Sequence, residues 1–175
     1  MNVSKLVKRA KRGNKEALVK LIMHEKQSFY KLALVYVGNE HDALDALENM
    51  IVILYGKIEQ LNDDEAFYRW SKTILVNECR AILKKKSKVS FLEDEQSVEQ
   101  KITPIEDVHI QFEIEHYLSI LSPLHKEAVQ LKYLLDYDYE TIAELTNVSI
   151  NTAKTRVFYA LKKLRMHFGE ENFYE

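Results

Sequence analysis

Apolar residues recur along the first half of the chain with the three- and four-residue spacing that lines one face of a helix. This spacing predicts helices over residues 2–12, 15–37, 42–60 and 64–87. Gly38 favours a left-handed end to the second helix. Asp42 and Asp63 or Asp64 are suited to open the third and fourth helices, because a carboxylate accepts amide hydrogens that lack a partner in the first turn.

The helical pattern disappears between Val89 and His109, a stretch that also contains Pro104. Loss of periodicity together with proline is typical of a connecting segment. We therefore expect a linker at residues 89–109 between two domains, at residues 1–88 and 110–175. A helix over about residues 106–121 would lead into the second domain, and Ser122-Pro123 predicts the next helix start, with Ser122 as N-cap and proline as the first helical residue.

The stretch from Tyr139 to Leu164 predicts two helices separated by a tight turn at Thr146-Asn147-Val148, with Ser149 as the N-cap of the second helix. The residues of the second helix that are expected to face the core are Ile150, Ala153, Val157, Ala160, Leu161 and Leu164. Those left outside are Asn151, Thr152, Lys154, Thr155, Arg156 and Phe158. Hydroxyls, an amide and two cations near a helix N-terminus suit base edges and phosphates in a DNA major groove, so we interpret this unit as a helix-turn-helix. Two amphipathic helices of an ordinary all-α domain are the alternative interpretation.

Composition agrees with an all-α fold. The chain has only 4 glycines and 2 prolines in 175 residues, and 46% of its residues are hydrophobic, which is enough for real cores. We therefore expect two small helical domains joined by a flexible acidic linker, with the C-terminal domain a helix-turn-helix.

The formal net charge of −2 hides a division along the chain. Residues 1–88 carry +6, from 17 Lys and Arg against 11 Asp and Glu, whereas residues 89–109 carry −5 and residues 110–175 carry −3. A net charge close to zero disfavours a protein that coats nucleic acid without specificity. We expect only particular surfaces of the protein to contact phosphate groups.

The sequence gives no sign of a membrane protein, a secreted protein, a metalloprotein or an enzyme. No apolar run of 18 residues and no hydrophobic signal segment is found, so we expect a cytoplasmic protein. Cys79 has no partner cysteine, and a structural thiol is favoured over an activated one. The histidines lack the i, i+4 pairs of a helical metal site; they are His24, His41, His109, His116, His125 and His167. Because a glycine-rich phosphate loop is also missing from the sequence, we expect no enzymatic activity, metal, cofactor or small-molecule substrate.

Three segments resemble, in their order and spacing, the small extracytoplasmic-function (ECF) group of bacterial RNA polymerase sigma factors in the sigma-70 family. They are DALDALENMIVILYGKI, AFYRWSKTILVNECRAILKKK and LSPLHKEAVQLKYLLDYDYETIAELTNVSINTAKTRVFYALKKLR. The resemblance implies a subunit that binds core RNA polymerase and directs promoter-specific initiation, by recognising and melting the −10 element and recognising the −35 element. The alternatives are a stand-alone helix-turn-helix transcriptional regulator and a helical interaction protein.

By this resemblance, Asp42, Asp45 and Glu48 dock on the clamp helices of the largest polymerase subunit. They lie at i, i+3 and i+6 and alternate with apolar residues on one predicted helix. A solvated acidic face is the alternative interpretation.

The resemblance assigns the −10 element to Phe67, Asn77, Arg80, Lys84, Lys85 and Lys86. Phe67 and Asn77 would form a pocket for a base flipped out of the non-template strand, and the loop from Leu61 to Glu65 would close it, while the cations would hold the backbone. Trp70 is predicted to belong to the core rather than to stack on a base, because other apolar residues lie at helical spacing from it.

The −35 element is assigned, again by resemblance, to Tyr139, Glu140, Asn151, Thr152, Lys154, Thr155, Arg156 and Phe158. Arg156 is expected either to hold phosphate or to form a structural ion pair. Two glycines usual in the family are replaced, by Asp136 and Asn151, and both replacements tolerate turn or cap conformations, so the fold is still expected.

The predicted linker has two interpretations. Its acids, among them Glu93, Asp94 and Glu95, suit a solvated spacer, or a segment that runs through the active cleft and RNA exit channel of the polymerase and mimics RNA, as in related sigma factors. The resemblance further implies an anti-sigma factor as partner, often membrane-anchored, that docks on apolar surface between the domains and prevents polymerase binding.

Overall fold

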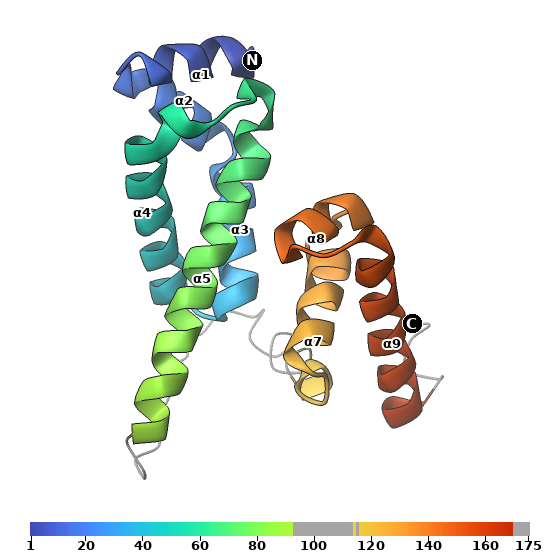
Figure 1. The fold of residues 1–175 in the computed structure, drawn as a ribbon. Helices are drawn as coiled ribbons and strands as arrows, with labels where there is room; N and C mark the ends of the chain where they lie inside the picture. The colour runs from blue at the N-terminus through green and yellow to red at the C-terminus, as the bar shows by residue number, and fades with distance from the viewer. Residues whose placement is uncertain (93–113, 115, 170–175) are drawn as a thin grey trace. The chain divides into compact units, whose positions relative to one another are not determined.

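The computed structural model describes residues 1–92, 114 and 116–169, and every regular element among them is helical. The chain divides into two compact units, Met1–Leu92 and Glu93–Glu175, shown in Figure 1. The predicted all-α fold with two helical domains is therefore confirmed. Most of the predicted linker, residues 93–109, lies outside the described residues.

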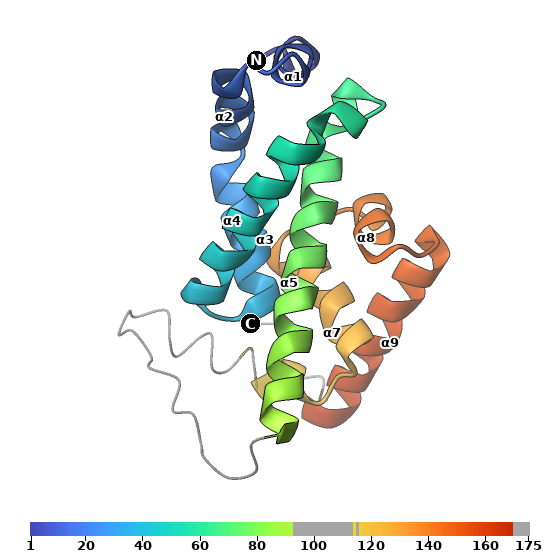
Figure 2. The ribbon, with the colours of Figure 1, turned by 60° about the vertical axis from the view of Figure 1, so that its left-hand side comes forward.

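Five helices and two short 3-10 turns form the described first unit. They are α1 (Val3–Lys11), α2 (Lys15–His24), α3 (Lys26–Val37), α4 (Glu40–Lys57), η1 (Ile58–Gln60), η2 (Asp64–Ala66) and α5 (Phe67–Leu92). Helices α3, α4 and α5 pack against one another, and α1 packs on α2 and on the η1–η2 connection. The C-terminal part of α5 extends beyond the ends of α3 and α4 (Figures 1 and 2).

The core of this unit combines large and very small side chains. Phe29 of α3 and Phe67 of α5 are almost completely buried, and each contributes roughly 1.5–3 kcal/mol through burial of its ring. Ala43 and Ala46 of α4 are also fully buried, and their small size lets the helix approach its neighbours closely.

Three predicted boundaries in this unit were wrong. The helix predicted over residues 15–37 is divided at Glu25, whose backbone leaves helical geometry at φ −108° and ψ 15°. Helix α4 begins at Glu40 because the Asn39 side chain accepts a hydrogen bond from the Asp42 amide at 2.9 Å, so Asn39 and not Asp42 is the cap. Helix α5 continues to Leu92, beyond the predicted end near residue 87. The left-handed stop at Gly38, with φ 75°, was predicted correctly.

The second unit is a smaller helical bundle. Residues 116–119 are helical, followed by α7 (Pro123–Val129), a π-helical turn η3 (Gln130–Leu134), α8 (Tyr139–Thr146) and α9 (Ile150–Phe168). One cluster of its core is made by Leu118, Leu121, Val129, Ala160 and Leu164. The π-helical turn was not predicted, and it is followed by Asp136 at φ 53°, a left-handed position where glycine was expected in the family.

The turn and caps of the helix-turn-helix match the prediction. Asn147 takes the left-handed conformation, with φ 53° and ψ 51°, and ends α8. The Ser149 hydroxyl accepts a hydrogen bond from the Thr152 amide at 3.1 Å and so caps α9. Ser122 and Pro123 take the predicted N-cap and first-turn positions of α7, although the Ser122 side chain makes no capping hydrogen bond.

Candidate nucleic-acid interface

The outer face of α9 carries the residues that were predicted to remain outside the core. Asn151, Thr152, Lys154, Thr155 and Phe158 are exposed, and Arg156 is partly buried. Behind them, Ala153, Val157, Ala160 and Leu164 are buried and fix the rotation of the helix. Ile150 was predicted to face the core but is 41% exposed, because it begins the helix at the edge of the packed face.

An aromatic ring at the start of α8 lies near two cations. The ammonium groups of Lys132 and Lys154 lie 5.3 and 5.8 Å from the centroid of the Tyr139 ring. Cation–π attraction at these distances helps to orient both lysines. Glu140 beside it is exposed. Lys132 was not predicted to belong to this surface, because nothing in the sequence indicated that the π-helical turn would bring it close to the helix-turn-helix.

A second polar and basic surface follows α5. Asn77, Lys84, Lys85 and Lys86 are exposed, and Arg80 is partly buried. Asn77 and Lys84 are seven residues apart and therefore share one side of the helix. This arrangement can place an amide and several cations along one nucleic-acid backbone.

Phe67 does not belong to that exposed surface. Its side chain is fully buried, so the predicted role as the wall of a base pocket is wrong for this structure. The ring packs against Tyr68 and Trp70, with centroids 5.4 and 6.5 Å away. Trp70 is half-buried in this contact, as expected of a residue attached to the core.

Cys79 is also part of the core. It is fully buried, and burial raises the pKa of its thiol to about 12, so the thiolate form is disfavoured at neutral pH. The preferred structural interpretation of this residue agrees with its surroundings.

Asp42 has a different environment from the one predicted for a docking residue. It is only 4% exposed, and its carboxylate accepts hydrogen bonds from the Asn39 amide group at 2.6 Å and from the Lys86 ammonium at 2.5 Å. A buried carboxylate with these partners is not available to a protein surface, so the assignment of Asp42 to polymerase binding is corrected. The same contact also engages Lys86, which had been assigned to DNA.

Opposing effects set the pKa of Asp42. Burial raises the pKa, but the hydrogen bonds from Lys86 and Asn39, with the charges of Lys86 and His41, lower it below its ordinary value. The carboxylate is therefore held in its charged form, and the ion pair fastens the base of the projecting part of α5 to the start of α4.

The exposed face of α4 is both acidic and apolar. Asp45 and Glu48 are exposed, so their carboxylates are accessible to solvent or to a partner. Large apolar side chains accompany them along the helix: Leu44 is 46%, Ile51 40%, Val52 70% and Tyr55 56% exposed. A shallow hollow of about 320 Å³ lies where this face meets α5, lined by Asp45, Glu48, Asn49, Glu78, Ala81, Ile82 and Lys85. Exposed apolar residues grouped in this way are typical of a protein-binding surface.

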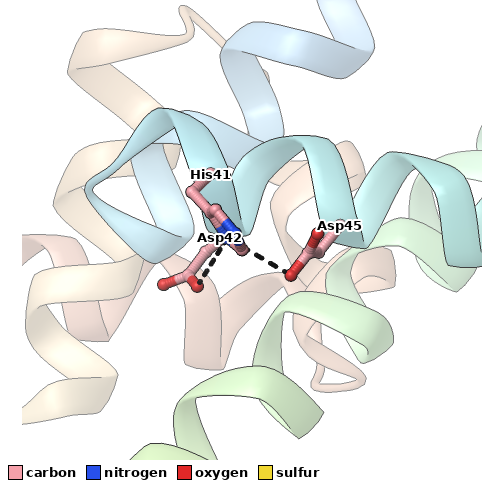
Figure 3. Close-up of side chains that lie close together, drawn as sticks. All are labelled: His41, Asp42 and Asp45. Atoms are coloured by element: carbon pink, nitrogen blue, oxygen red, sulfur yellow. Dashed lines mark ion pairs between the residues drawn. The ribbon is translucent and has the colours of Figure 1, made fainter.

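The first turns of α4 also bring an imidazole close to two carboxylates (Figure 3). His41 Nδ1 lies 3.9 Å from Asp42 Oδ1 and 3.4 Å from Asp45 Oδ2, and one ligand atom from each residue lies within 4.8 Å of the others. The sequence has no i, i+4 pair of histidines, so it gave no signal of this group. Because Lys86 already supplies a cation to Asp42, we interpret the group as part of the charged surface of α4.

Within the described ranges, no helix is both long enough and apolar enough to cross a membrane.

Similarity to known proteins distinguishes a sigma factor from a stand-alone regulator and from a helical interaction protein. Residues 21–89 match the family model for sigma-70 region 2, and residues 111–164 match that for sigma-70 region 4. RNA polymerase sigma factor SigV of Bacillus subtilis (strain 168) is 33% identical over 162 residues, which are 93% of this chain and 97% of that protein. The chain belongs to the sigma-70 family. It is an ECF sigma factor, a transcription initiation factor that directs RNA polymerase to promoters.

Other relatives of this sigma factor have similar lengths. ECF sigma factor SigW of Bacillus subtilis (strain 168) is 24% identical over 180 residues, covering 94% of this chain and 96% of its own. The ECF sigma-E factor of Haemophilus influenzae is 26% identical over 172 residues, covering 89% of each chain.

Solved structures share the fold of this sigma factor. CnrH, in complex with the cytosolic domain of CnrY, superposes with a TM-score of 0.73 at 16% identity, over 97% of this chain and 98% of that one. The sigma factor RpoE of Bartonella quintana, in complex with the anti-sigma factor NepR, gives a TM-score of 0.69 at 21% identity, over 87% and 96% of the two chains.

Proposed function

We propose that this sigma factor reads the −35 element with the outer face of α9, contacts the −10 element with α5, and binds core polymerase with the exposed face of α4. Residues 1–88 would then supply the polymerase and −10 functions, and residues 110–175 the −35 function. The observation that carries the proposal is the outer face of α9, which is polar and basic at its N-terminal end while the opposite side is buried.

On the −35 side, the proposed contacts are Tyr139, Glu140, Asn151, Thr152, Lys154, Thr155 and Phe158, with Arg156 on phosphate. Short polar side chains in the first turns of a recognition helix can reach base edges, while an exposed aromatic ring can meet a thymine methyl group. Lys132, close to Tyr139, is a further cation on this surface.

On the −10 side, Asn77 is the exposed polar group proposed to meet an extruded base, and Arg80, Lys84 and Lys85 are proposed to hold the backbone. The loop Leu61–Glu65 would border that base, as the resemblance implies. Phe67 lies in the core and is left out of this contact, and Lys86 anchors α5 through Asp42.

For polymerase binding, Asp45 and Glu48 together with the exposed apolar residues of α4 form the proposed contact with the clamp helices of the largest subunit. Apolar residues at the centre of such a surface supply affinity, and the acids at its edge supply orientation. Because this partner acts on chromosomal DNA, we place the protein in the cytoplasm.

An anti-sigma factor is the proposed regulator. The two solved structures named above each contain a bound partner, the cytosolic domain of CnrY in one case and the anti-sigma factor NepR in the other. Exposed apolar side chains on each unit, such as Val52 and Tyr133, could be covered by such a protein. A stable complex that excludes core polymerase is expected.

The test is run-off transcription with bacterial core polymerase on a promoter pool randomised at both elements, followed by sequencing of the transcripts. Wild-type protein should give starts that share two spaced upstream motifs. Lys154→Ala and Thr155→Ala should change preference only in the −35 motif, by roughly 5- to 150-fold at the contacted base pairs.

Lys162→Ala is the matched control, because Lys162 is an exposed lysine about two helical turns C-terminal to Thr155 and is not among the proposed contacts. Its motif preference should equal that of wild type. Absence of protein-dependent starts, together with no complex with core polymerase on gel filtration, would refute the proposed function.

A further inference from the structure

One lysine ties the first helix of the chain to the connection between α4 and α5. Lys11, the last residue of α1, donates from Nζ to the Leu61 carbonyl at 2.5 Å and to the Asp64 carboxylate at 2.5 Å. The acceptors are 50 and 53 residues away in sequence. Both contacts therefore hold this loop from outside its own flanking helices.

The loop has one edge that is fixed and one that is open to solvent. The Lys11 and Asp64 side chains are only 24% and 15% exposed, and Leu61 is buried. Asn62, Asp63 and Glu65 alternate with these anchored residues and are exposed. Holding Leu61 and Asp64 thus determines which side chains the loop presents.

The contact between Lys11 and Asp64 also reduces the negative charge of the loop. Asp63, Asp64 and Glu65 form a run of three acids directly before α5, the helix proposed to contact the −10 element. Such a run would repel phosphate, and Lys11 neutralises its middle member. Because both partners are largely buried, salt screens this pair less than it screens a pair on the surface.

We propose that Lys11 is a positioning residue for −10 recognition, holding the Leu61–Glu65 loop so that its exposed edge meets the unpaired base. This rests on the proposed function and adds α1 to the −10 machinery. Helix α1 lies outside residues 21–89, the part that matches sigma-70 region 2.

The experiment compares Lys11→Met, Lys11→Arg, Asp64→Asn and Lys8→Met in the same randomised transcription assay. Lys8→Met removes the same charge from an exposed position of α1 and is the matched control. Lys11→Met should reduce discrimination at one or more −10 positions by about fivefold or more, with the −35 motif unchanged. Asp64→Asn should shift the same positions by a smaller factor, and Lys11→Arg should retain most of the preference.

Hydrogen exchange separates positioning from general loss of folding. In Lys11→Met the amide of Ala66, which donates to the Asp63 carbonyl at 3.1 Å, should exchange faster, while amides within α3 should not change. If Lys11→Met fails to fold, Asp64→Asn carries the test with both readouts.

The inference would be overturned if Lys11→Met kept the wild-type −10 preference. If Lys11→Met does not fold, a wild-type −10 preference in Asp64→Asn would overturn it. A change in Lys8→Met as large as that in Lys11→Met would overturn it too. If wild-type protein gave no starts at all, the proposed function would fail instead. The exchange measurement would then still report whether Lys11 holds the loop.

Discussion

At the scale of single residues, Asp42 was predicted to bind a partner at the surface, but in the structure it is buried and pairs with a lysine of the same chain. Its carboxylate joins the first turn of α4 to Lys86 on α5, where it meets the cation at 2.5 Å. Breaking a pair in which the carboxylate is buried leaves a charge without its partner, which is costlier than losing a contact at the surface. Asp42 therefore stabilises the position of the basic end of α5.

We predict that Asp42→Asn lowers the free energy of unfolding at neutral pH by about 1–2 kcal/mol, since charge-assisted hydrogen bonds are lost and Lys86 is partly solvated. The folded pKa of Asp42 is below its unfolded value, so its contribution is present above the unfolded pKa and lost as the pH falls through the folded pKa. Below about pH 4 the difference between wild type and Asp42→Asn should therefore shrink.

Urea denaturation followed by circular dichroism across this pH range provides the measurement. Glu48→Gln is the control, because it removes a carboxylate from the exposed face of the same helix. If the Asp42→Asn and wild-type curves kept a constant separation from neutral to acid pH, the ion pair would not be the source of the stability.

At the scale of elements, α9 depends on its first turn. The Ser149 hydroxyl accepts from the Thr152 amide at 3.1 Å and lies 2.8 Å from the Thr152 hydroxyl, so one side chain orders the turn that carries the proposed base contacts. Local capping and the proposed base recognition therefore share the same few residues.

We predict that Ser149→Ala destabilises the protein by about 1 kcal/mol, whereas Ser149→Asp, which restores an acceptor, remains close to wild type. Faster hydrogen exchange of the Thr152 amide in Ser149→Ala, measured by NMR, would locate the effect in the first turn. Equal stability losses in the alanine and aspartate variants would argue against a capping role.

Elements were predicted well where the signal is local. The Ser149 cap of α9 and the turn at Asn147 follow from side chains that bond their own backbone or tolerate a left-handed conformation. The break at Glu25 was missed because apolar spacing continues across it. Helix α2 packs on α1, whereas α3 packs on α4 and α5. The cap at Asn39 was missed because Asp42 is an equally good cap by residue type.

At the scale of the whole molecule, the division of charge suits a subunit that relies on polymerase for DNA binding. The second unit holds the proposed −35 surface, yet residues 110–175 carry a net charge of −3. Counterion release therefore adds little to the DNA affinity of this unit on its own. Attachment to polymerase would raise the effective concentration of the unit at the promoter.

We predict that the free sigma factor binds a duplex promoter at physiological salt no more tightly than the range of non-specific binding, with a Kd of roughly 10⁻⁴ to 10⁻⁶ M. Fluorescence anisotropy with promoter and scrambled duplexes, with and without core polymerase, gives the comparison. Specific nanomolar binding by the free chain would contradict this expectation and favour the behaviour of a stand-alone regulator.

The sequence by itself determined the helical class, the two-unit organisation, the helix-turn-helix with its turn and caps, and the family. These features depend on periodicity and on bonds between near neighbours, which a linear pattern records. Only the tertiary structure decided the burial of Phe67 and the pairings of Asp42 with Lys86 and of Lys11 with the Leu61–Asp64 loop. Those pairings join residues more than 40 positions apart, and an exposed charge and a buried, paired one look the same in a sequence.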